Sequence, residues 1–463
     1  MVRVRFAPSP TGKLHVGNVR TALANILYAR KHGGTFVVRM EDTDISREVE
    51  NAEQQILDDL TWLGMTPDED PTKGGEFGPY RTNERSVRGD YEKAIQKLFD
   101  DGRAYECYVS KGELDLMRKI QTSQGLPPHY DNRHRDLSDA EKEKFKAEGR
   151  EPVIRFKLND SSIEWEDMVR GAVKYEAKNL GGDPVIVRSN GVPIFALAGA
   201  VDDINQNITH VVRGEDHVTN TAIQVQIFEA LGAKVPQMAH MPMLLDKDGG
   251  KLSKRLDGLS IQQLRAEGYL PKAILTYMTS LGFSAMPEVG TVDDLAQNFD
   301  FTKMGRSAVR FDNDQLKRVN ATVIRQSSYA EMKPYLEGFL NSSKSEAELE
   351  VFWDAVKGNI ELLSELQEQY NMCYREMGEE SLAGDDVEYI KVALEMLPKG
   401  PYSAETWQNW TAELKAQTGR KGKQLFMPLR IALTGQKQGP EMASLLTVMG
   451  EAVAQQRLEE SLK

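Results

Sequence analysis

The chain has 463 residues, of which 40% are hydrophobic and 28% are charged, and this composition predicts roughly two to four globular domains with their own cores. Its two cysteines, Cys107 and Cys373, exclude a disulfide framework, and the lack of a signal-peptide pattern or a long apolar run favours a cytoplasmic location. The net charge of −12 argues against indiscriminate nucleic-acid binding but leaves room for a local basic track that binds one specific nucleic acid.

The chain begins with a predicted strand, a turn and a helix. Residues 2–6 alternate apolar and charged side chains, and apolar residues at three- and four-residue steps predict a helix over 19–31. His15 and Gly17 then lie near a helix N-terminus, where free N–H groups favour a phosphate and a glycine lets it approach the backbone. For an isolated His-x-Gly, a simple helix cap is the commoner role, so the phosphate hypothesis needs a second motif.

The next predicted strand, 36–40, ends in an acidic segment. Glu41, Asp42, Thr43 and Asp44 follow it directly, and ligands of open α/β sheets bind at the carboxyl ends of strands. For Asp42 and Asp44, a solvated turn is an equally good explanation.

The second candidate phosphate-binding segment comes more than two hundred residues later. A short apolar strand with Leu244 and Leu245 leads through a glycine-rich turn into the sequence KLSKR at 251–255. Its three cations could close over a polyphosphate and neutralise a leaving pyrophosphate. A lysine-rich loop alone is usually a solvated turn, but its order and separation from the His-x-Gly segment favour a joint function.

These two segments resemble the signature motifs of class I aminoacyl-tRNA synthetases, with PSPTGKLHVG at 8–17 and KLSKR at 251–255. Four further blocks make the chain similar to a bacterial-type glutamyl-tRNA synthetase: RMEDTD at 39–44, GPYRTNER at 78–85, VVRGEDHVTNT at 211–221 and MPLRIALTG at 427–435. The blocks run from one end to the other, so the resemblance covers essentially the whole chain.

The resemblance implies an α/β Rossmann-like catalytic domain with an inserted α/β acceptor-binding domain, followed by an all-α anticodon-binding region. The expected boundaries are 1–86 and 191–242 for the catalytic domain, 87–190 for the insert, 243–320 for a stem-contact region with the KLSKR loop, and 321–463 for the anticodon-binding region. Strand-like segments at 153–158 and 184–189 support the insert, and long helical windows beyond Asn320 favour the bacterial type over relatives with β-barrel anticodon domains.

The chemistry implied is activation of glutamate by ATP, with Mg²⁺, to glutamyl-adenylate, and transfer to the 3′ end of tRNA-Glu. Such phosphoryl chemistry needs positioning and charge stabilisation more than a protein nucleophile. The resemblance assigns the catalytic groups to His15, Gly17, Lys251, Ser253 and Lys254. It assigns ATP binding to Ser9, His15, Gly17, Asn18, His217, Leu244, Leu245 and Lys254.

The implied glutamate pocket consists of Arg5, Ala7, Ser9, Glu41, Phe195, Gly199 and Arg213. Arg213 is the choice for the γ-carboxylate, because a guanidinium binds carboxylates bidentately, and Glu41 is expected to bind the ammonium group. Phe195 and Gly199 depart from the family, which usually has tyrosine and in many members asparagine there. These departures leave room for a specialised second copy of the enzyme.

The zinc positions of some relatives are also altered. Cys107-x-Val109 and His134-x-Asp136 stand where Cys-x-Cys and Cys-x-His pairs occur in those relatives. One thiolate and one imidazole do not make a closed tetrahedral site, so we expect no structural zinc.

Two questions of function stay open at this point. A relaxed enzyme would also charge tRNA-Gln, and alignment places the anticodon-reading position at Asn359, with Lys357 as the nearest cation. The alternative class is a non-catalytic synthetase-like protein that binds tRNA. We expect a monomer with tRNA-Glu, glutamate and ATP as partners and no membrane association.

Overall fold

The computed structural model describes residues 1–42, 49, 51–250, 252, 259–375, 378, 380–382 and 384–463. These residues form two compact units. The N-terminal unit comprises Met1–Gln262 and Leu275–Asp312, and the C-terminal unit comprises Gln263–Ile274 and Asn313–Lys463. None of the described helices is long and apolar enough to cross a bilayer.

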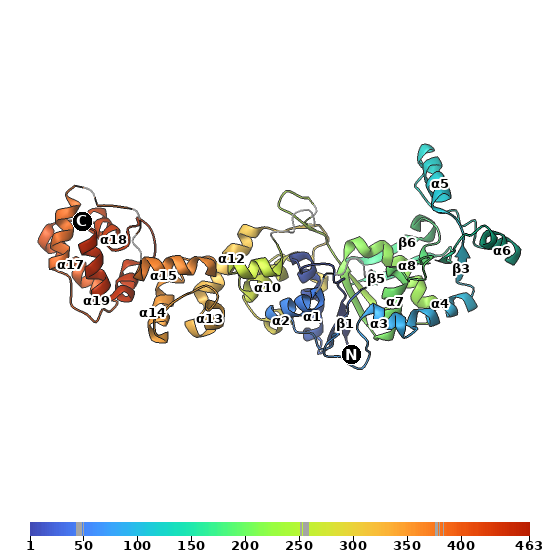
Figure 1. The fold of residues 1–463 in the computed structure, drawn as a ribbon, viewed down its shortest axis with the longest axis horizontal. Coiled ribbons are helices and arrows are strands. Elements are labelled where there is room, and N and C mark those ends of the chain that lie inside the picture. Colours follow the sequence, from blue (N-terminus) through green and yellow to red (C-terminus); the bar gives the residue numbers. More distant parts are fainter. Residues whose placement is uncertain are drawn as a thin grey trace. The chain divides into compact units, whose positions relative to one another are not determined.

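The N-terminal unit is built around a six-stranded sheet (Figure 1). Its strands, in spatial order, are β2 (Thr35–Val38), β1 (Arg3–Phe6), β8 (His210–Gly214), β9 (Gln237–Met241), β5 (Ser162–Asp167) and β6 (Gly171–Glu176). Neighbours from β2 to β5 run parallel, and β5 and β6 form an antiparallel hairpin. The carboxyl ends of these five parallel strands therefore lie on one edge, as the Rossmann-like prediction requires.

Strand β1 confirms the predicted strand at 2–6 but is buried along its whole length. The charged residues of its alternating pattern do not face water. Arg3 forms an ion pair with Glu69, and Arg5 forms one with Asp203. Paired partners make the burial of these two charges tolerable.

Helices cover this sheet and connect its strands. They are α1 (Val16–Lys31), α2 (Ala52–Trp62), α3 (Thr82–Val87), α4 (Asp90–Asp100), α7 (Phe195–Asn205) and α8 (Val218–Ala230). Helix α1 contacts β1, β2 and β8, and α7 packs on α8. Helix α1 starts three residues before the predicted Val19, because His15 caps it.

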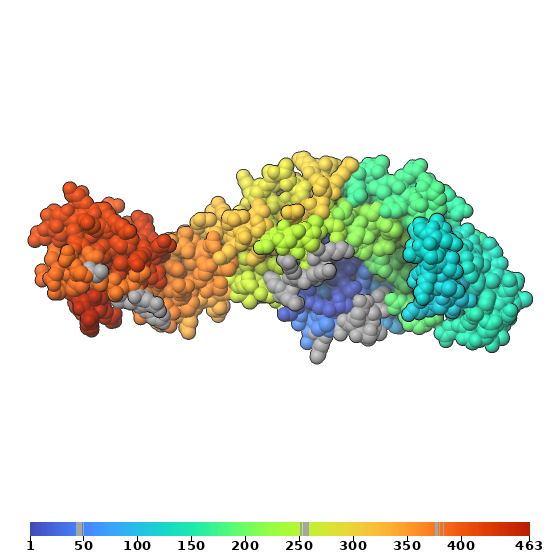
Figure 2. Space-filling model, turned by 90° about the horizontal axis from the view of Figure 1, so that it is seen from above, coloured from blue at the N-terminus to red at the C-terminus, as the bar shows by residue number. Residues whose placement is uncertain are grey.

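The predicted insert, 87–190, contains a second sheet of β3 (Ala104–Cys107), β4 (Val153–Phe156) and β7 (Val185–Val187). Helices α5 (Lys111–Ser123) and α6 (Asp139–Ala147) also belong to it. Helix α5, cyan in Figure 2, lies on the surface and exposes Leu116 and Ile120. Strands β5 and β6 come from the same segment but join the main sheet, so the expected insert is not wholly separate from the catalytic domain.

The last part of the N-terminal unit contains a parallel pair of strands, β10 (Leu244–Leu245) and β11 (Val309–Arg310), and α11 (Val292–Asn298). Helices α9 (Ile261–Glu267) and α10 (Pro271–Ser280) lie between β10 and α11 in the chain. The domain boundaries expected from the sequence stay predictions.

The C-terminal unit is helical, and its described residues include no strand. Its helices after α10 are α12 (Asn313–Gln326), α13 (Tyr329–Leu336), α14 (Glu346–Val356), α15 (Leu366–Tyr374), α16 (Asp386–Glu395), α17 (Thr406–Thr418), α18 (Lys423–Thr434) and α19 (Met442–Glu460). Capping boxes start α13 and α14, and Trp353 and Trp410 are fully buried. The predicted all-α region is confirmed.

Candidate active site

A cavity of about 860 Å³ lies at the carboxyl edge of the main sheet, between the ends of β1 and β8 and the start of α1. Most of the residues expected from the sequence line it: Arg5, Ala7, Ser9, His15, Gly17, Asn18, Glu41, Phe195, Arg213, His217 and Leu244. Segments that are more than two hundred residues apart in the chain thus contribute to one site.

Five expected site residues are not among those that line the cavity. Leu245 is the second residue of β10, and Gly199 is buried inside α7. A Cβ atom on Gly199 would stand 3.2 Å from Nε2 of Gln224. Lys251, Ser253 and Lys254 lie outside the described residues.

His15 is the N-cap of α1. Its Nδ1 atom accepts hydrogen bonds from the backbone N–H groups of Gly17, at 3.1 Å, and Asn18, at 3.3 Å. Because Nδ1 is an acceptor, the proton of the neutral ring is on Nε2, which is left as the ring's donor. Burial lowers the pKa of His15 below its ordinary value, which favours this neutral form.

The first turn of α1 differs from the sequence-based expectation of free N–H groups. Besides the two N–H groups that His15 Nδ1 accepts, Val16 donates to the carbonyl oxygen of Leu259 and Val19 donates to that of His15. An anion at this helix end would therefore meet the helix dipole and the Nε2–H of His15 rather than a free backbone donor.

Gly17 makes the His15 cap possible. A Cβ atom at this position would lie 3.0 Å from Cε1 and 3.1 Å from Nδ1 of His15. The glycine thus gives room to the folded-back imidazole, and it is this ring, not a phosphate, that approaches the backbone. The simple cap and the functional role of the motif are two parts of one arrangement.

Arg213 brings a buried positive charge to the cavity. The residue is 5% exposed, and no carboxylate of the described residues forms an ion pair with it. Nη2 donates to Thr221 Oγ1 at 2.5 Å and Gln224 Oε1 at 2.8 Å, while Nη1 has no partner. Burial lowers the pKa of Arg213 to about 9. An unbalanced guanidinium in a cavity is a binding site for an anionic group.

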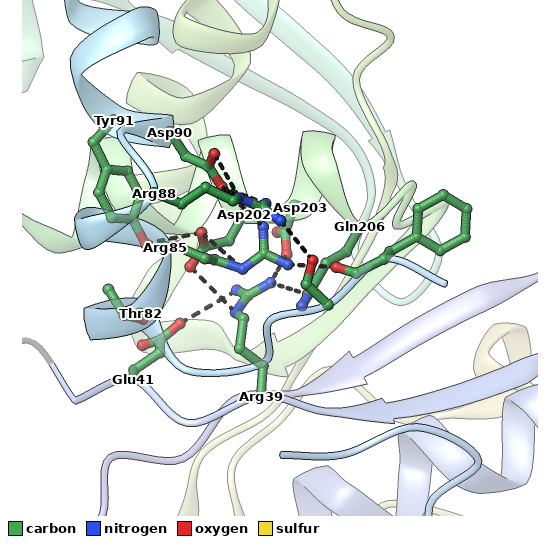
Figure 3. A network of polar contacts seen from close by, with 12 residues as sticks. Arg39, Glu41, Thr82, Arg85, Arg88, Asp90, Tyr91, Asp202, Asp203 and Gln206 are labelled. Atoms are coloured by element: carbon green, nitrogen blue, oxygen red, sulfur yellow. Dashed lines mark hydrogen bonds and ion pairs between the residues drawn. The ribbon is translucent and has the colours of Figure 1, made fainter. Parts of the chain in front are cut away.

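Two other buried arginines near the cavity, Arg39 and Arg5, have acidic partners, and Figure 3 shows the network around Arg39. Arg20, which also lines the cavity, donates instead to the carbonyl oxygens of Pro242 and Leu281. Arg39, which is fully buried, donates from Nη1 to Asp203 Oδ1 at 2.8 Å and stands 3.5 Å from Asp202. Arg5 contacts the same Asp203 at 3.1 Å. Glu41 lies 3.4 Å from Arg39, and burial raises the pKa of its carboxyl. This loose contact leaves Glu41 able to bind a cationic group.

Sequence reasoning missed this network. Asp202 and Asp203 stand at the end of an otherwise apolar helix segment, residues 194–204, and two adjacent acids there were a signal of buried, paired carboxylates. Arg39 gave no such signal, because its burial depends on the carboxylates of Asp202 and Asp203, which are more than 160 residues away in the chain.

Phe195 and His217 form an aromatic wall of the cavity. Their ring centroids are 5.2 Å apart. His217 Nδ1 lies 3.2 Å from Nδ2 of Asn220, and burial followed by the charge of Arg213 lowers the pKa of His217. The two rings are tilted by 41° to each other, so a base could stack on the face of one ring and contact the other.

Cys107 and His134, which stand where some relatives have zinc ligands, form hydrogen bonds within the protein. Cys107 Sγ donates to the hydroxyl of Tyr130 at 3.4 Å, and His134 Nδ1 accepts the N–H of Tyr108 at 3.1 Å. Among the described residues, no group of three or more side chains could hold a metal ion. The absence of structural zinc stays a prediction.

The expected anticodon-reading position follows α14. Asn359 is exposed, and its N–H donates to the carbonyl oxygen of Val356 at 2.8 Å. Lys357 Nζ lies 2.6 Å from the carboxylate of Asp354. The nearest cation is thus already paired, and Asn359 offers a neutral amide.

Comparison with known proteins agrees with this geometry over the whole chain. The family of class I tRNA synthetases (E and Q), catalytic domain, matches residues 1–318, and an anticodon binding domain matches residues 327–462. Glutamate–tRNA ligase 1 of Maricaulis maris is 44% identical over 460 residues, and glutamate–tRNA ligase 2 of Gluconacetobacter diazotrophicus is 41% identical over 459 residues. Both alignments cover 99% of each chain.

A solved structure is also similar. The crystal structure of a glutamate tRNA ligase from Elizabethkingia meningosepticum, in complex with its amino acid, has a TM-score of 0.88 and 30% sequence identity. The match covers 100% of this chain and 99% of that chain. With both domains matched in order, the chain belongs to the family of class I tRNA synthetases for E and Q.

Proposed function

We propose that this chain is a glutamate–tRNA ligase, which uses ATP to activate glutamate and transfers the glutamyl group to the 3′ end of tRNA-Glu. Full-length relatives with this name support the assignment. The observation that carries it is the pairing, in one cavity, of the unbalanced Arg213 with the capped His15. The first suits a carboxylate and the second suits a phosphate.

Glutamate binds with its γ-carboxylate on Arg213 and its ammonium group on Glu41. Arg213 suits this role better than Arg5, because Arg5 already contacts Asp203. The pocket then has a cation for the acid and an anion for the amine. Glutamine would leave the Arg213 charge unbalanced, which is a physical basis for rejecting it.

ATP binds with its adenine beside His217 and Leu244 and its α-phosphate near His15. The α-carboxylate of glutamate attacks the α-phosphorus, a new O–P bond forms, and the bond to pyrophosphate breaks. Nε2–H of His15 stabilises the charge on the α-phosphate oxygens in the transition state. Mg²⁺ enters with ATP and neutralises its phosphates, and Lys251 and Lys254 hold the β- and γ-phosphates.

A second proposal is that the chain also charges tRNA-Gln. The exposed, neutral Asn359 supports it, whereas the names of the relatives give glutamate–tRNA ligase alone. A preference for tRNA-Glu above roughly 1,000-fold in kcat/KM, about 4 kcal/mol, would rule it out. A non-catalytic tRNA-binding protein is not favoured, because the cap of His15 and the open Arg213 are intact. The monomeric state and the cytoplasmic location stay predictions.

The test is glutamate-dependent exchange of pyrophosphate into ATP, with and without tRNA. We expect exchange with tRNA present and none without it, because members of the family that this chain resembles generally activate glutamate only when tRNA is bound. Exchange without tRNA would contradict that requirement. A chain that shows no exchange under either condition would overturn the proposed function.

A further inference from the structure

Arg213 is held from behind by a chain of buried polar side chains that ends at Asp167. Thr221 Oγ1, which accepts from Arg213, lies 2.7 Å from Nε2 of His240. That same Nε2 lies 3.4 Å from Nε of Arg213. On the other side of the ring, His240 Nδ1 is 2.5 Å from Oδ2 of Asp167. His240 is fully buried and Asp167 is 2% exposed.

Three neighbouring strands place these groups. Arg213 on β8 is the register partner of His240 on β9, and Asp167 ends β5, where it pairs with Met238 of β9. Asp167 belongs to the segment expected as the acceptor-binding insert. The alignment of the strands therefore brings a residue of that segment to the rear of the proposed glutamate pocket.

The carboxylate of Asp167 is fixed as an acceptor. Its Oδ1 accepts the backbone N–H groups of Val169 and Arg170, both at 3.0 Å, and that of His240 at 3.2 Å. Burial favours the neutral form of Asp167, but the hydrogen bond from His240 and the bonds from the backbone N–H groups outweigh it and lower the pKa of Asp167. An acceptor at Oδ2 obliges His240 Nδ1 to carry the proton.

The tautomer of His240 follows from this contact. With the proton on Nδ1, the neutral ring has a lone pair on Nε2, and this lone pair faces the hydroxyl of Thr221 and the guanidinium of Arg213. The Thr221 hydroxyl has one proton, which it shares between Nε2 of His240 at 2.7 Å and the carbonyl oxygen of His217 at 3.1 Å. Arg213 has only donors, so it requires acceptors behind it. Burial lowers the pKa of His240, which keeps the ring neutral beside the arginine.

We propose that Asp167 and His240 are positioning residues for the substrate carboxylate. Asp167 holds His240 in the tautomer that accepts at Nε2, and this acceptor, with Thr221 and Gln224, orients Arg213 so that Nη1 stays free for glutamate. The inference rests on the proposed function, because it takes the anion on Arg213 to be the γ-carboxylate. Neither Asp167 nor His240 is among the residues that line the cavity.

The experiment measures KM for glutamate and for ATP in tRNA-dependent pyrophosphate exchange. His240→Leu removes the acceptor and should raise KM for glutamate about tenfold while KM for ATP changes less than about twofold. His240→Gln, whose amide oxygen can accept at the position of Nε2, should restore most of the loss. The matched control is Gln226→Leu. Gln226 is a buried amide on α8, the helix that also carries Thr221 and Gln224, but its partners are Asn159 and Arg103 and not Arg213.

A double-mutant cycle tests the role of the tautomer. Asp167→Asn places an amide donor opposite Nδ1, so that His240 Nε2 becomes a donor facing Arg213, and KM for glutamate should rise. In the His240→Gln background the same change should add little, because no tautomer is left to set.

Two results would overturn the inference. The first is an active wild-type enzyme together with a His240→Leu variant that has the same KM for glutamate. The second is an equal rise of KM for glutamate and KM for ATP in both His240→Leu and Gln226→Leu, which is what a merely structural role gives. A wild-type chain without any glutamate-dependent exchange would instead refute the proposed function, so the two failures can be told apart.

Discussion

At the scale of single residues, the imidazole of His15 combines a structural role with a proposed chemical role. His15 uses Nδ1 to satisfy two N–H groups of α1 and keeps Nε2–H for a ligand. The cap fixes the ring orientation that a phosphate donor needs, so the structural and the chemical roles depend on each other. A side chain that is fixed before the substrate arrives loses no freedom in the transition state.

The first prediction concerns Gly17→Ala. The added methyl group would push against Cε1 and Nδ1 of His15, at 3.0 and 3.1 Å, and turn the ring away from the cap. We expect adenylate formation to slow by roughly 10²-fold, the scale of one lost preorganised donor. The measurement is the single-turnover rate of activation. Gly112→Ala is the control, because its Cβ meets nothing within 4 Å, and an equal loss there would contradict the argument.

The second prediction concerns the pH dependence of activation. The pKa of His15 lies below its ordinary value of 6.5 because burial disfavours the imidazolium. The neutral ring therefore caps the helix at any pH above the lowered pKa. As the pH falls through that pKa, Nδ1 gains a proton that faces two N–H groups, and the cap is lost. Activation should be insensitive to His15 between about pH 7 and 8 and decline in acid.

The variant that isolates this ionisation is His15→Asn, which can still cap α1 but does not titrate. Pyrophosphate exchange is followed against pH for both proteins. The wild type should show one acid ionisation more than the variant. A midpoint above 6.5 for that extra ionisation would contradict the prediction.

At the scale of elements, a buried ion network fastens α7 to β1 and β2. Arg39 on the chain after β2 and Arg5 on β1 share Asp203 of α7. Tyr91 of α4 donates to Asp202 at 2.9 Å, which links the start of the predicted insert to the same helix. The network thus holds Arg5 through Asp203 and Glu41 through Arg39, and Figure 3 shows the part around Arg39 and Glu41.

The third prediction compares two adjacent carboxylates. Burial favours the neutral form of Asp203, but the charges of Arg5 and Arg39 outweigh this effect and lower the pKa of Asp203. For Asp202, burial prevails and raises the pKa. Asp203→Asn leaves two buried guanidinium groups short of a counter-charge and should cost about 3–5 kcal/mol of unfolding free energy. Asp202→Asn should cost clearly less. Urea unfolding at pH 7 checks both, and the opposite ranking would contradict the network as described.

The fourth prediction concerns the corner of the insert where some relatives hold zinc. Cys107, Tyr130 and His134 bond to each other or to backbone, and the rings of His134 and Phe145 lie 5.0 Å apart. The purified chain should contain less than about 0.1 zinc per molecule, and a chelator should leave its unfolding temperature unchanged. One zinc per chain in metal analysis would overturn the prediction.

At the scale of the whole molecule, the proposed function divides between the two units. The N-terminal unit has the sheet and the charged cavity, and the C-terminal unit has helices whose described residues include the exposed Asn359. Under that proposal, a substitution at Asn359 should change the choice of tRNA and leave the residues that line the cavity unaltered.

The fifth prediction follows from this division. Asn359→Arg supplies a planar fork that can read a base edge, and it should raise the preference for tRNA-Glu over tRNA-Gln about tenfold. KM for glutamate should not change. The measurement is kcat/KM on the two purified transcripts. The control is Asn409→Arg, another exposed asparagine in the C-terminal unit, because an equal effect there would show that added charge alone is responsible.

The sequence by itself determined the fold class, the family and most of the residues around the cavity. The signature segments at 8–17 and 251–255, with the further blocks along the chain, identified the family, and the resemblance then assigned residues such as His15, Glu41 and Arg213 to the site. The helical character of the C-terminal unit also followed from local periodicity.

Only the tertiary structure decided which hydrogen-bond partners and counter-charges these residues have. The free N–H groups expected at α1 are bonded to His15 and Leu259, the strand charges of Arg3 and Arg5 are buried, and β5 of the predicted insert joins the main sheet. The chain Asp167–His240–Thr221–Arg213 joins three strands and a helix. Periodicity reports which face of an element is apolar, but a hydrogen-bond partner or a counter-charge across the fold depends on strand order and register, which no local pattern encodes.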